Sequence, residues 1–273
     1  MRVAALQFDV RRGEAAANLA EVERGLARAA DEGVELVVLP EMWPTSFPDA
    51  GADVAAEQAA ARAALARLAE LAEARGLMVC GTAFGFDAPA ERPPNRWQLL
   101  DGARELARYD KVHLFSPTAE TEVFTPGSAP PPTVATRLGR VAGMICYDLR
   151  FPELTREPWY DGAEVVCAPA QWPVARAPHL RALCVGLAVS GQCFVVAANR
   201  TGSETVGRRG LVLDFPGNSL VVDPHGRVLA EGDGTPGLVT AELDLGLCAE
   251  LRKRVPVRRD LRPDLYAAWR ARR

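Results

Sequence analysis

The sequence lacks a strong excess of either charge, since its 273 residues carry 32 lysines plus arginines against 35 aspartates plus glutamates. A net charge of −3 produces no global field that favours nucleic acid or an anionic membrane. Long apolar runs are also missing: none approaches the ~18 residues that span a bilayer, and residues 1–10 resemble a strand, not a signal segment. We therefore expect a cytoplasmic protein with neither a nucleic-acid nor a membrane partner.

Paired cysteines and lysine are both scarce. The six cysteines form no CxxC pair and mostly lie in apolar runs, where free cysteine behaves as a small buried hydrophobe. This pattern argues against a disulfide framework and against a zinc site, so we expect no metal. Of the 32 basic residues only Lys111 and Lys253 are lysine. A lysine near reactive side chains is therefore informative, because arginine fills almost every other cationic position.

The remaining composition, 48% hydrophobic and 25% charged, is that of an ordinary globular domain, and the length suits one domain over residues 1–273. Short apolar or alternating segments predict strands at 2–10, 35–40, 77–84, 97–100, 108–115, 133–138, 140–146, 163–170, 193–199, 219–222 and 227–230. Helical spacing predicts a helix capped by Asn18 and ended by Gly33, and further helices at 53–75, 152–160 and 178–189. Strands that alternate with helices predict an α/β fold with mixed, helix-covered sheets.

The C-terminal segment, residues 252–273, carries nine basic and two acidic side chains. Such a segment suits either a nucleic-acid-binding tail or an arm that contacts another subunit. Apolar side chains are interleaved with its charges, at Val255, Leu261, Leu265, Tyr266 and Trp269. Because those side chains favour burial, the pattern favours an arm.

Three reactive side chains lie at or near strand ends. Glu41 directly follows the apolar run ELVVLP, Cys146 ends VAGMIC just before a turn, and Lys111 lies in the extended RYDKVHLF segment. In open α/β sheets, reactive groups gather in the crevice beyond the strand ends. Cys146 is favoured over Cys167, the nearest rival, because a strand-to-turn junction exposes a side chain to the free amides that follow it.

These residue types together suit nucleophilic catalysis. A thiol becomes a strong nucleophile when a base removes its proton, and a carboxylate does this where an ammonium stabilises the developing charge. The same ammonium stabilises the oxyanion of a tetrahedral intermediate. A cysteine–histidine arrangement with His113, His179 or His225 remains an alternative, although none has the local cysteine signature of the papain type.

Five stretches of the chain match a known pattern, namely LPEMWPTSF, YDKVHLF, CYDLRFPE, AQWP and ANRTGS, and weaker likeness in MRVAALQFDV and RRDLRPDLY extends the match over nearly the whole chain. In these motifs the chain resembles the nitrilase superfamily of carbon-nitrogen hydrolases. The resemblance implies an α/β four-layer α-β-β-α sandwich. It also implies a homodimer in which the C-terminal arm crosses the interface, and an amide-cleaving enzyme without a cofactor.

Carried over residue by residue, the resemblance makes Glu41 the general base, Cys146 the nucleophile and Lys111 the oxyanion stabiliser, with the Tyr147 backbone amide as a second donor. Glu120, seven residues after His113, falls where the family places a further catalytic carboxylate, and is preferred to Glu122.

One family motif is altered. The usual Arg-Ala-x-Glu-Asn of the helix after the site reads Leu187-Ala-Val-Ser-Gly191 here, so both charged members are missing. Because the two charges are lost together, no unpaired buried charge remains, which favours repacking over inactivity.

Within the superfamily the motifs look most like those of the omega-amidases, which deamidate short 2-oxo dicarboxylic monoamides. Arg150 is a candidate for binding an anionic substrate, unless it pairs with Asp148 or Glu153. Trp172 is a candidate pocket wall, although a core position suits it almost as well. The spacing leaves open other substrates, namely N-carbamoyl amino acids, nitriles or a deaminated peptide, and also a non-catalytic scaffold.

Overall fold

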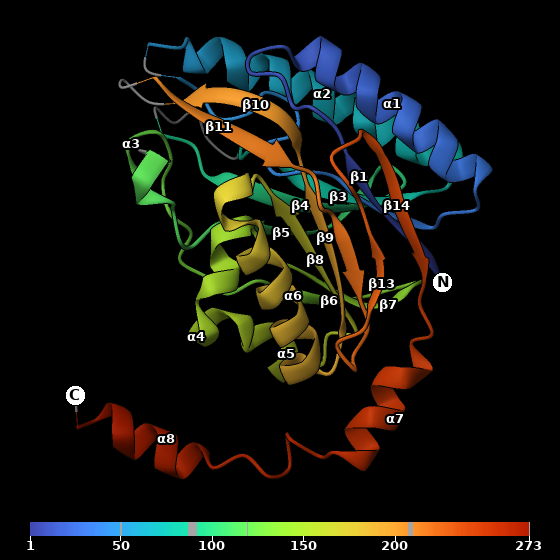
Figure 1. The fold of residues 1–273 in the computed structure, drawn as a ribbon, viewed down its shortest axis with the longest axis vertical. Helices are drawn as coiled ribbons and strands as arrows, with labels where there is room; N and C mark the ends of the chain where they lie inside the picture. The colour runs from blue at the N-terminus through green and yellow to red at the C-terminus, as the bar shows by residue number, and fades with distance from the viewer. Residues whose placement is uncertain (50, 87–91, 119, 207–209, 273) are drawn as a thin grey trace.

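The computed structural model describes residues 1–49, 51–86, 92–118, 120–206 and 210–272. Two six-stranded sheets pack face to face, with helices on their outer faces (Figure 1). The first sheet has the order β14 (Gly237–Glu242), β1 (Arg2–Gln7), β2 (Leu36–Val38), β3 (Met78–Phe84), β4 (Asn95–Asp101), β5 (Arg104–Asp110). The second has the order β13 (Val228–Glu231), β12 (Leu220–Val222), β9 (Phe194–Asn199), β8 (Val165–Ala170), β7 (Gly139–Gly143), β6 (Thr133–Thr136). The predicted α-β-β-α sandwich is confirmed.

Alternation along the strands divides the apolar side chains between two cores. In β1, Val3 and Ala5 face the second sheet, whereas Ala4 and Leu6 face the outer helices. The inner core between the sheets also holds Trp97, whose fully buried ring lies against Gly143 of the facing sheet. A Cβ at position 143 would lie 2.2 Å from the indole, so this contact requires glycine.

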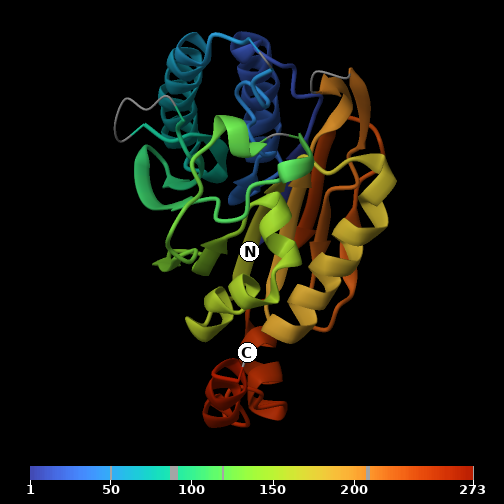
Figure 2. The same cartoon turned by 90° about the vertical axis from the view of Figure 1, so that its left-hand side faces the viewer.

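The outer helices follow directly from local sequence signals. The first sheet is covered by α1 (Ala15–Asp31) and α2 (Val54–Arg75), and the second by α4 (Pro152–Thr155), α5 (Glu157–Tyr160) and α6 (Ala177–Gly191) (Figures 1 and 2). Asp53 caps α2 by accepting a hydrogen bond from the Ala56 amide, and Gly76 ends it at φ +62°. The predicted helix over residues 53–75 is therefore confirmed.

Asn18 does not cap the first helix, contrary to the sequence prediction. The helix begins three residues earlier, and Asn18 is fully buried within it. Its side chain accepts from the Arg11 amide and donates to the carbonyls of Arg11 and Pro44. The residue therefore ties two loops together, a function that depends on long-range contacts.

Other elements also differ from the prediction. The predicted helix over 152–160 is broken at Arg156 into α4 and α5. The hairpin of β10 (Thr201–Val206) and β11 (Leu211–Pro216) was not predicted, nor was β14. Two short 3₁₀ turns and one short helix lie in the loops between larger elements: η1 (Ser116–Thr118), α3 (Glu120–Val123) and η3 (Val174–Arg176).

The C-terminal arm leaves the sandwich. It contains α7 (Gly246–Arg254) and α8 (Pro263–Arg270), and α8 extends well away from both sheets (Figures 1 and 2). Val255 and Trp269 are 50% and 53% exposed, so the burial that their apolar side chains favour is not reached within this chain. Among the described helices, none is long and apolar enough to cross a membrane.

Candidate active site

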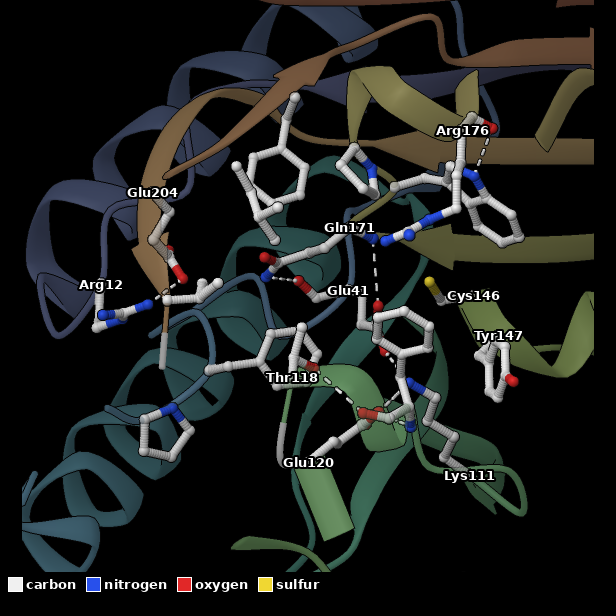
Figure 3. Close-up of a pocket in the computed structure, with 18 of the residues that line it drawn as sticks. Arg12, Glu41, Lys111, Thr118, Glu120, Cys146, Tyr147, Gln171, Arg176 and Glu204 are labelled. Carbon is white, nitrogen blue, oxygen red and sulfur yellow. Dashed lines mark hydrogen bonds and ion pairs between the residues drawn. The ribbon is translucent and has the colours of Figure 1, made fainter. Parts of the chain in front are cut away.

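A pocket of about 740 Å³, including its open mouth, lies at one edge of the two sheets (Figure 3). Its lining brings together all seven residues singled out from the sequence: Glu41, Lys111, Glu120, Cys146, Tyr147, Arg150 and Trp172. Aromatic side chains from β11 and from the loops after β2 and β5 form much of the remaining wall. Much of the pocket wall is therefore apolar, and a small set of charged groups projects from it, as is usual for sites that bind small molecules.

Strand ends position the reactive side chains. Glu41 follows β2, Cys146 follows β7, and Trp172 follows β8, while Lys111 directly follows β5. The strands β2, β7 and β8 each run parallel to a neighbour, so the chain leaves them at the same edge of the sandwich. The strand order and directions of the sheets therefore bring these side chains together.

Lys111 links two buried carboxylates. Its Nζ lies 2.7 Å from Glu41 Oε1 and 2.8 and 2.9 Å from the two oxygens of Glu120. All three side chains are nearly fully buried. The Phe115 amide also donates to Glu120. Glu122 is exposed. The structure therefore brings Glu120, and not Glu122, to the lysine.

Asn95 is a member of this cluster that the sequence did not reveal. Its Nδ2 donates to Glu41 Oε1 at 2.9 Å and reaches Glu120 Oε1 at 3.4 Å, while its backbone carbonyl accepts from the Lys111 amide. The side chain is fully buried, and its Oδ1 has no hydrogen-bond partner among the described atoms. The antiparallel pairing of β4 with β5 sets Asn95 beside Lys111, and sequence spacing alone gave no signal of this register.

Cys146 begins the 3₁₀ turn η2 (Cys146–Arg150) with a left-handed backbone, at φ +43°. A non-glycine residue in this conformation is strained, and such strain is often found where a turn presents a reactive side chain. The thiol lines the pocket together with the Glu41 carboxylate and the Lys111 ammonium, and interacts electrostatically with both. Cys167, the sequence rival, lies inside the core on β8 and does not line the pocket.

Burial and neighbouring charges together determine the protonation of the cluster. Burial raises the pKa of Cys146 well above its ordinary value, and the Glu41 charge raises it further while Lys111 lowers it. Burial also raises the pKa of Glu41 above 4.5, against the lowering effect of Lys111. Burial alone would lower the pKa of Lys111, but Glu120 and Glu41 outweigh it, so the net shift is upward. The resting site therefore holds a neutral thiol beside an ammonium.

Asp148 holds the lysine segment against the cysteine turn. It is fully buried, and accepts from the Tyr109 hydroxyl at 2.8 Å and from the His113 amide at 3.0 Å. The His113 ring lies 2.9 Å from the same carboxylate and stacks on Phe151. Because these partners flank Lys111, the contacts fix the lysine relative to η2.

The histidines give no support to a cysteine–histidine arrangement. No described histidine lines the pocket. His113 is bound by Asp148, His179 lies 3.1 Å from an Arg150 nitrogen, and His225 lies in the turn between β12 and β13.

Gln171 and a buried ion pair hold Glu41 from the other side. The Gln171 amide donates to Glu41 Oε2 at 3.2 Å, and its side chain donates to the Glu41 carbonyl. The Gln171 oxygen accepts from Arg200, which is 1% exposed and pairs with Glu204 at 2.7 Å. Ser46 joins this network by donating to Glu204. These residues are remote in sequence, and only the fold assembles them.

The predicted substrate-binding residues lie around the mouth. Tyr147 packs edge-on against Phe115, and Trp172 is buried with its ring under the Arg150 guanidinium at 4.8 Å. In the described part of the chain, Arg150 pairs with neither Asp148 nor Glu153. Farther along α6, Leu187 is buried where the family motif has a charge, which agrees with repacking.

A metal site has no basis in the described residues, because no group of three or more metal-binding side chains is present among them. The chemistry the cluster can perform is nucleophilic attack by sulfur, with a carboxylate as base and an ammonium near the developing oxyanion.

Comparison with known proteins agrees with this geometry. Residues 2–253 match the Carbon-nitrogen hydrolase family. The chain is 34% identical over 265 residues to 2-oxoglutaramate amidase of Bacillus subtilis (strain 168), covering 97% of this chain and 98% of that protein. It is 32% identical over 228 residues to the omega-amidase YafV of Yersinia enterocolitica, covering 83% and 84%.

A solved amidase from Nesterenkonia sp. superposes with a TM-score of 0.83 at 29% identity, over 98% of this chain and 96% of that one. A glutamate-to-glutamine variant of that amidase has been solved with acrylamide added to its active-site cysteine. Family match, fold and cluster geometry therefore agree, and this chain belongs to the carbon-nitrogen hydrolase family.

Proposed function

We propose that this protein is an omega-amidase that releases ammonia from short 2-oxo dicarboxylic acid monoamides, such as 2-oxoglutaramate. The observation that carries the proposal is the buried cluster in which one ammonium contacts two carboxylates, in the same pocket that the Cys146 thiol lines. The named activities of the Bacillus and Yersinia relatives support the substrate class.

Acylation begins when Glu41 takes the Cys146 proton as the sulfur attacks the amide carbon and a C–S bond forms. The carbonyl π electrons move to oxygen, giving a tetrahedral oxyanion. Glu41 then returns the proton to the amide nitrogen, the C–N bond breaks, and ammonia leaves a thioester on Cys146. In the second half, water attacks the thioester while Glu41 or Glu120 takes its proton. The C–S bond breaks, and the sulfur recovers a proton as the acid leaves.

The oxyanion is stabilised by Lys111 and by the backbone amide of Tyr147. Tyr147 follows Cys146 in the first turn of η2, where backbone amides have no intrahelical acceptor. Lys111 contacts both oxygens of Glu120. One Lys111 N–H group can therefore turn to the oxyanion, while Glu120 still accepts a hydrogen bond from another Lys111 N–H group and one from the Phe115 amide.

Arg150 and Trp172 bind the far end of the substrate. Arg150 supplies a cation for a carboxylate, and stacking over the indole holds its guanidinium in place. Trp172 is buried and shapes the apolar wall beside it.

The test is a panel of 2-oxoglutaramate, simple nitriles, N-carbamoyl amino acids and deaminated glutathione, with ammonia release measured for the wild type and for Cys146→Ala. We expect the highest kcat/KM on 2-oxoglutaramate and none in Cys146→Ala. If ammonia is released from nitriles alone, or faster from deaminated glutathione than from 2-oxoglutaramate, the omega-amidase assignment is overturned in favour of that activity. Release from no compound would favour a non-catalytic scaffold.

We also propose that the protein is a single-domain cytoplasmic homodimer whose C-terminal arm packs on the second copy. Support comes from the exposed Val255 and Trp269 on an arm that leaves its own sandwich, and from six cysteines that are all free and buried. Light scattering of the full chain gives its mass in solution. Trp269→Glu is expected to shift that mass toward the monomer, and a monomeric wild type would contradict the proposal.

A further inference from the structure

Four cationic side chains line the pocket, and two of them are neutralised by carboxylates. Lys111 contacts Glu41 and Glu120, as described above. Arg12 pairs with Glu204 and lies 3.3 Å from Asp49. Because their charge is already balanced, these two cations have little left to attract an anionic group from solution.

The other two, Arg150 and Arg176, have no carboxylate within ion-pair distance among the described residues. Arg150 contacts a ring nitrogen of His179, and Arg176 stacks over the Phe115 ring at 5.2 Å. Both are only partly exposed. Two guanidinium groups without a carboxylate partner give this one wall of the pocket a local positive charge that the net charge of −3 conceals.

One indole orients both arginines. The Trp172 ring lies under the Arg150 guanidinium at 4.8 Å, and its Nε1–H donates to the Arg176 carbonyl at 2.7 Å. Arg176 also directly precedes α6, whose N-terminus adds a partial positive charge on the same side. Its side chain extends into the pocket on the side of Cys146 (Figure 3). This wall is preorganised, because stacking on Trp172 and on Phe115 restricts the rotamers of the two arginines and the indole hydrogen bond fixes the Arg176 backbone.

We propose that Arg176 binds the substrate carboxylate together with Arg150, and that it is the residue that makes the pocket select anionic over neutral amides. The inference rests on the proposed omega-amidase function and adds the group that recognises its substrate class. A planar guanidinium offers two parallel N–H donors to a carboxylate, and a second guanidinium leaves donors for an adjacent 2-oxo oxygen. Glutamine at position 176 keeps much of the length and polarity but removes the charge.

The experiment compares kcat/KM for 2-oxoglutaramate and for neutral butyramide in the wild type, Arg176→Gln, Arg176→Lys and Arg181→Gln. Arg181 is the matched control, because it lies on α6 but is 53% exposed and paired with Glu231. In Arg176→Gln we expect a loss of about 10- to 100-fold on 2-oxoglutaramate, mainly in KM, the range for a hydrogen bond to a charged group. Butyramide should be unaffected, Arg176→Lys should recover part of the loss, and Arg181→Gln should resemble the wild type.

The outcomes separate the two proposals. If the wild type prefers 2-oxoglutaramate and Arg176→Gln keeps that preference, the role of Arg176 is overturned and the omega-amidase function stands. Equal losses on both substrates would also overturn it, since they indicate a structural defect. If the wild type itself prefers butyramide, the proposed function fails and the inference fails with it. Binding of 2-oxoglutaramate to Cys146→Ala and to Cys146→Ala/Arg176→Gln, measured by calorimetry, checks the same difference without turnover.

Discussion

Replacing Lys111 with arginine keeps the charge of the cluster and changes only its shape. The ammonium makes three contacts of 2.7 to 2.9 Å, to Glu41 and to both oxygens of Glu120, in a site that is 1% exposed at the lysine. A guanidinium is larger, and its donors lie in one plane. It cannot reproduce these contacts and also turn a donor toward the reacting carbonyl.

The magnitude follows from two effects. Loss of one oxyanion donor lowers kcat by about 10²- to 10³-fold. Forcing extra volume into a buried site costs roughly 1–3 kcal/mol. Lys111→Met instead leaves two buried carboxylates without a cation, which costs roughly 3–5 kcal/mol. Stability should therefore fall in the order wild type, Lys111→Arg, Lys111→Met, although both variants lose turnover.

The assay is ammonia release from 2-oxoglutaramate, with thermal unfolding measured on the same preparations. Lys253→Arg makes the identical chemical change at the other lysine of the chain, which is exposed on α7, and should leave both measurements unchanged. Retention of more than about a tenth of the wild-type kcat in Lys111→Arg would refute the point-charge argument, because the loss expected for a missing donor is larger. A folded variant with that loss would support it.

Two further predictions concern proton transfer and packing. Since burial raises the pKa of Glu41, the rate of Cys146 alkylation by iodoacetamide should fall on acidification at a pH above 4.5. Lys111 lowers that pKa and Glu120 raises it, so Lys111→Met should move the fall to higher pH and Glu120→Gln to lower pH; shifts in the same direction would contradict the assignment. Gly143→Ala places a Cβ 2.2 Å from the buried indole of the facing sheet and should cost roughly 1–3 kcal/mol in thermal or urea unfolding. Gly186→Ala, with open space at its Cβ, is the control, and an equal loss there would argue against the packing explanation.

The candidate catalytic residues could be found from the sequence because each carries a local signal. Glu41 and Cys146 directly follow apolar strands, and Lys111 is one of only two lysines. Local signals also predicted the second helix, over residues 53–75, and most strands of the two sheets.

The supporting residues carry no such signal. Asn95 reaches Glu41 only because β4 pairs with β5 in one register, and a shift of one residue would turn its side chain to the other face. Arg200 meets Gln171 and Ser46 across 29 and 154 positions of sequence. Asn18 was predicted to be a helix cap for the same reason, because a local sequence pattern does not show its hydrogen bond to the distant Pro44 carbonyl. Contacts of this kind follow from the packing of complete elements.

The charge balance of the cluster determines the order of the chemical events. One ammonium contacts two carboxylates in a buried site, and a thiolate would add a further negative charge there. The raised pKa of Cys146 expresses that cost. In the proposed mechanism the proton therefore leaves sulfur as the C–S bond forms, when the new negative charge moves to the carbonyl oxygen beside Lys111. A neutral resting thiol is also a poor target for oxidants, since the thiolate is the reactive form. The same burial that delays ionisation thus keeps the nucleophile intact until an amide is bound.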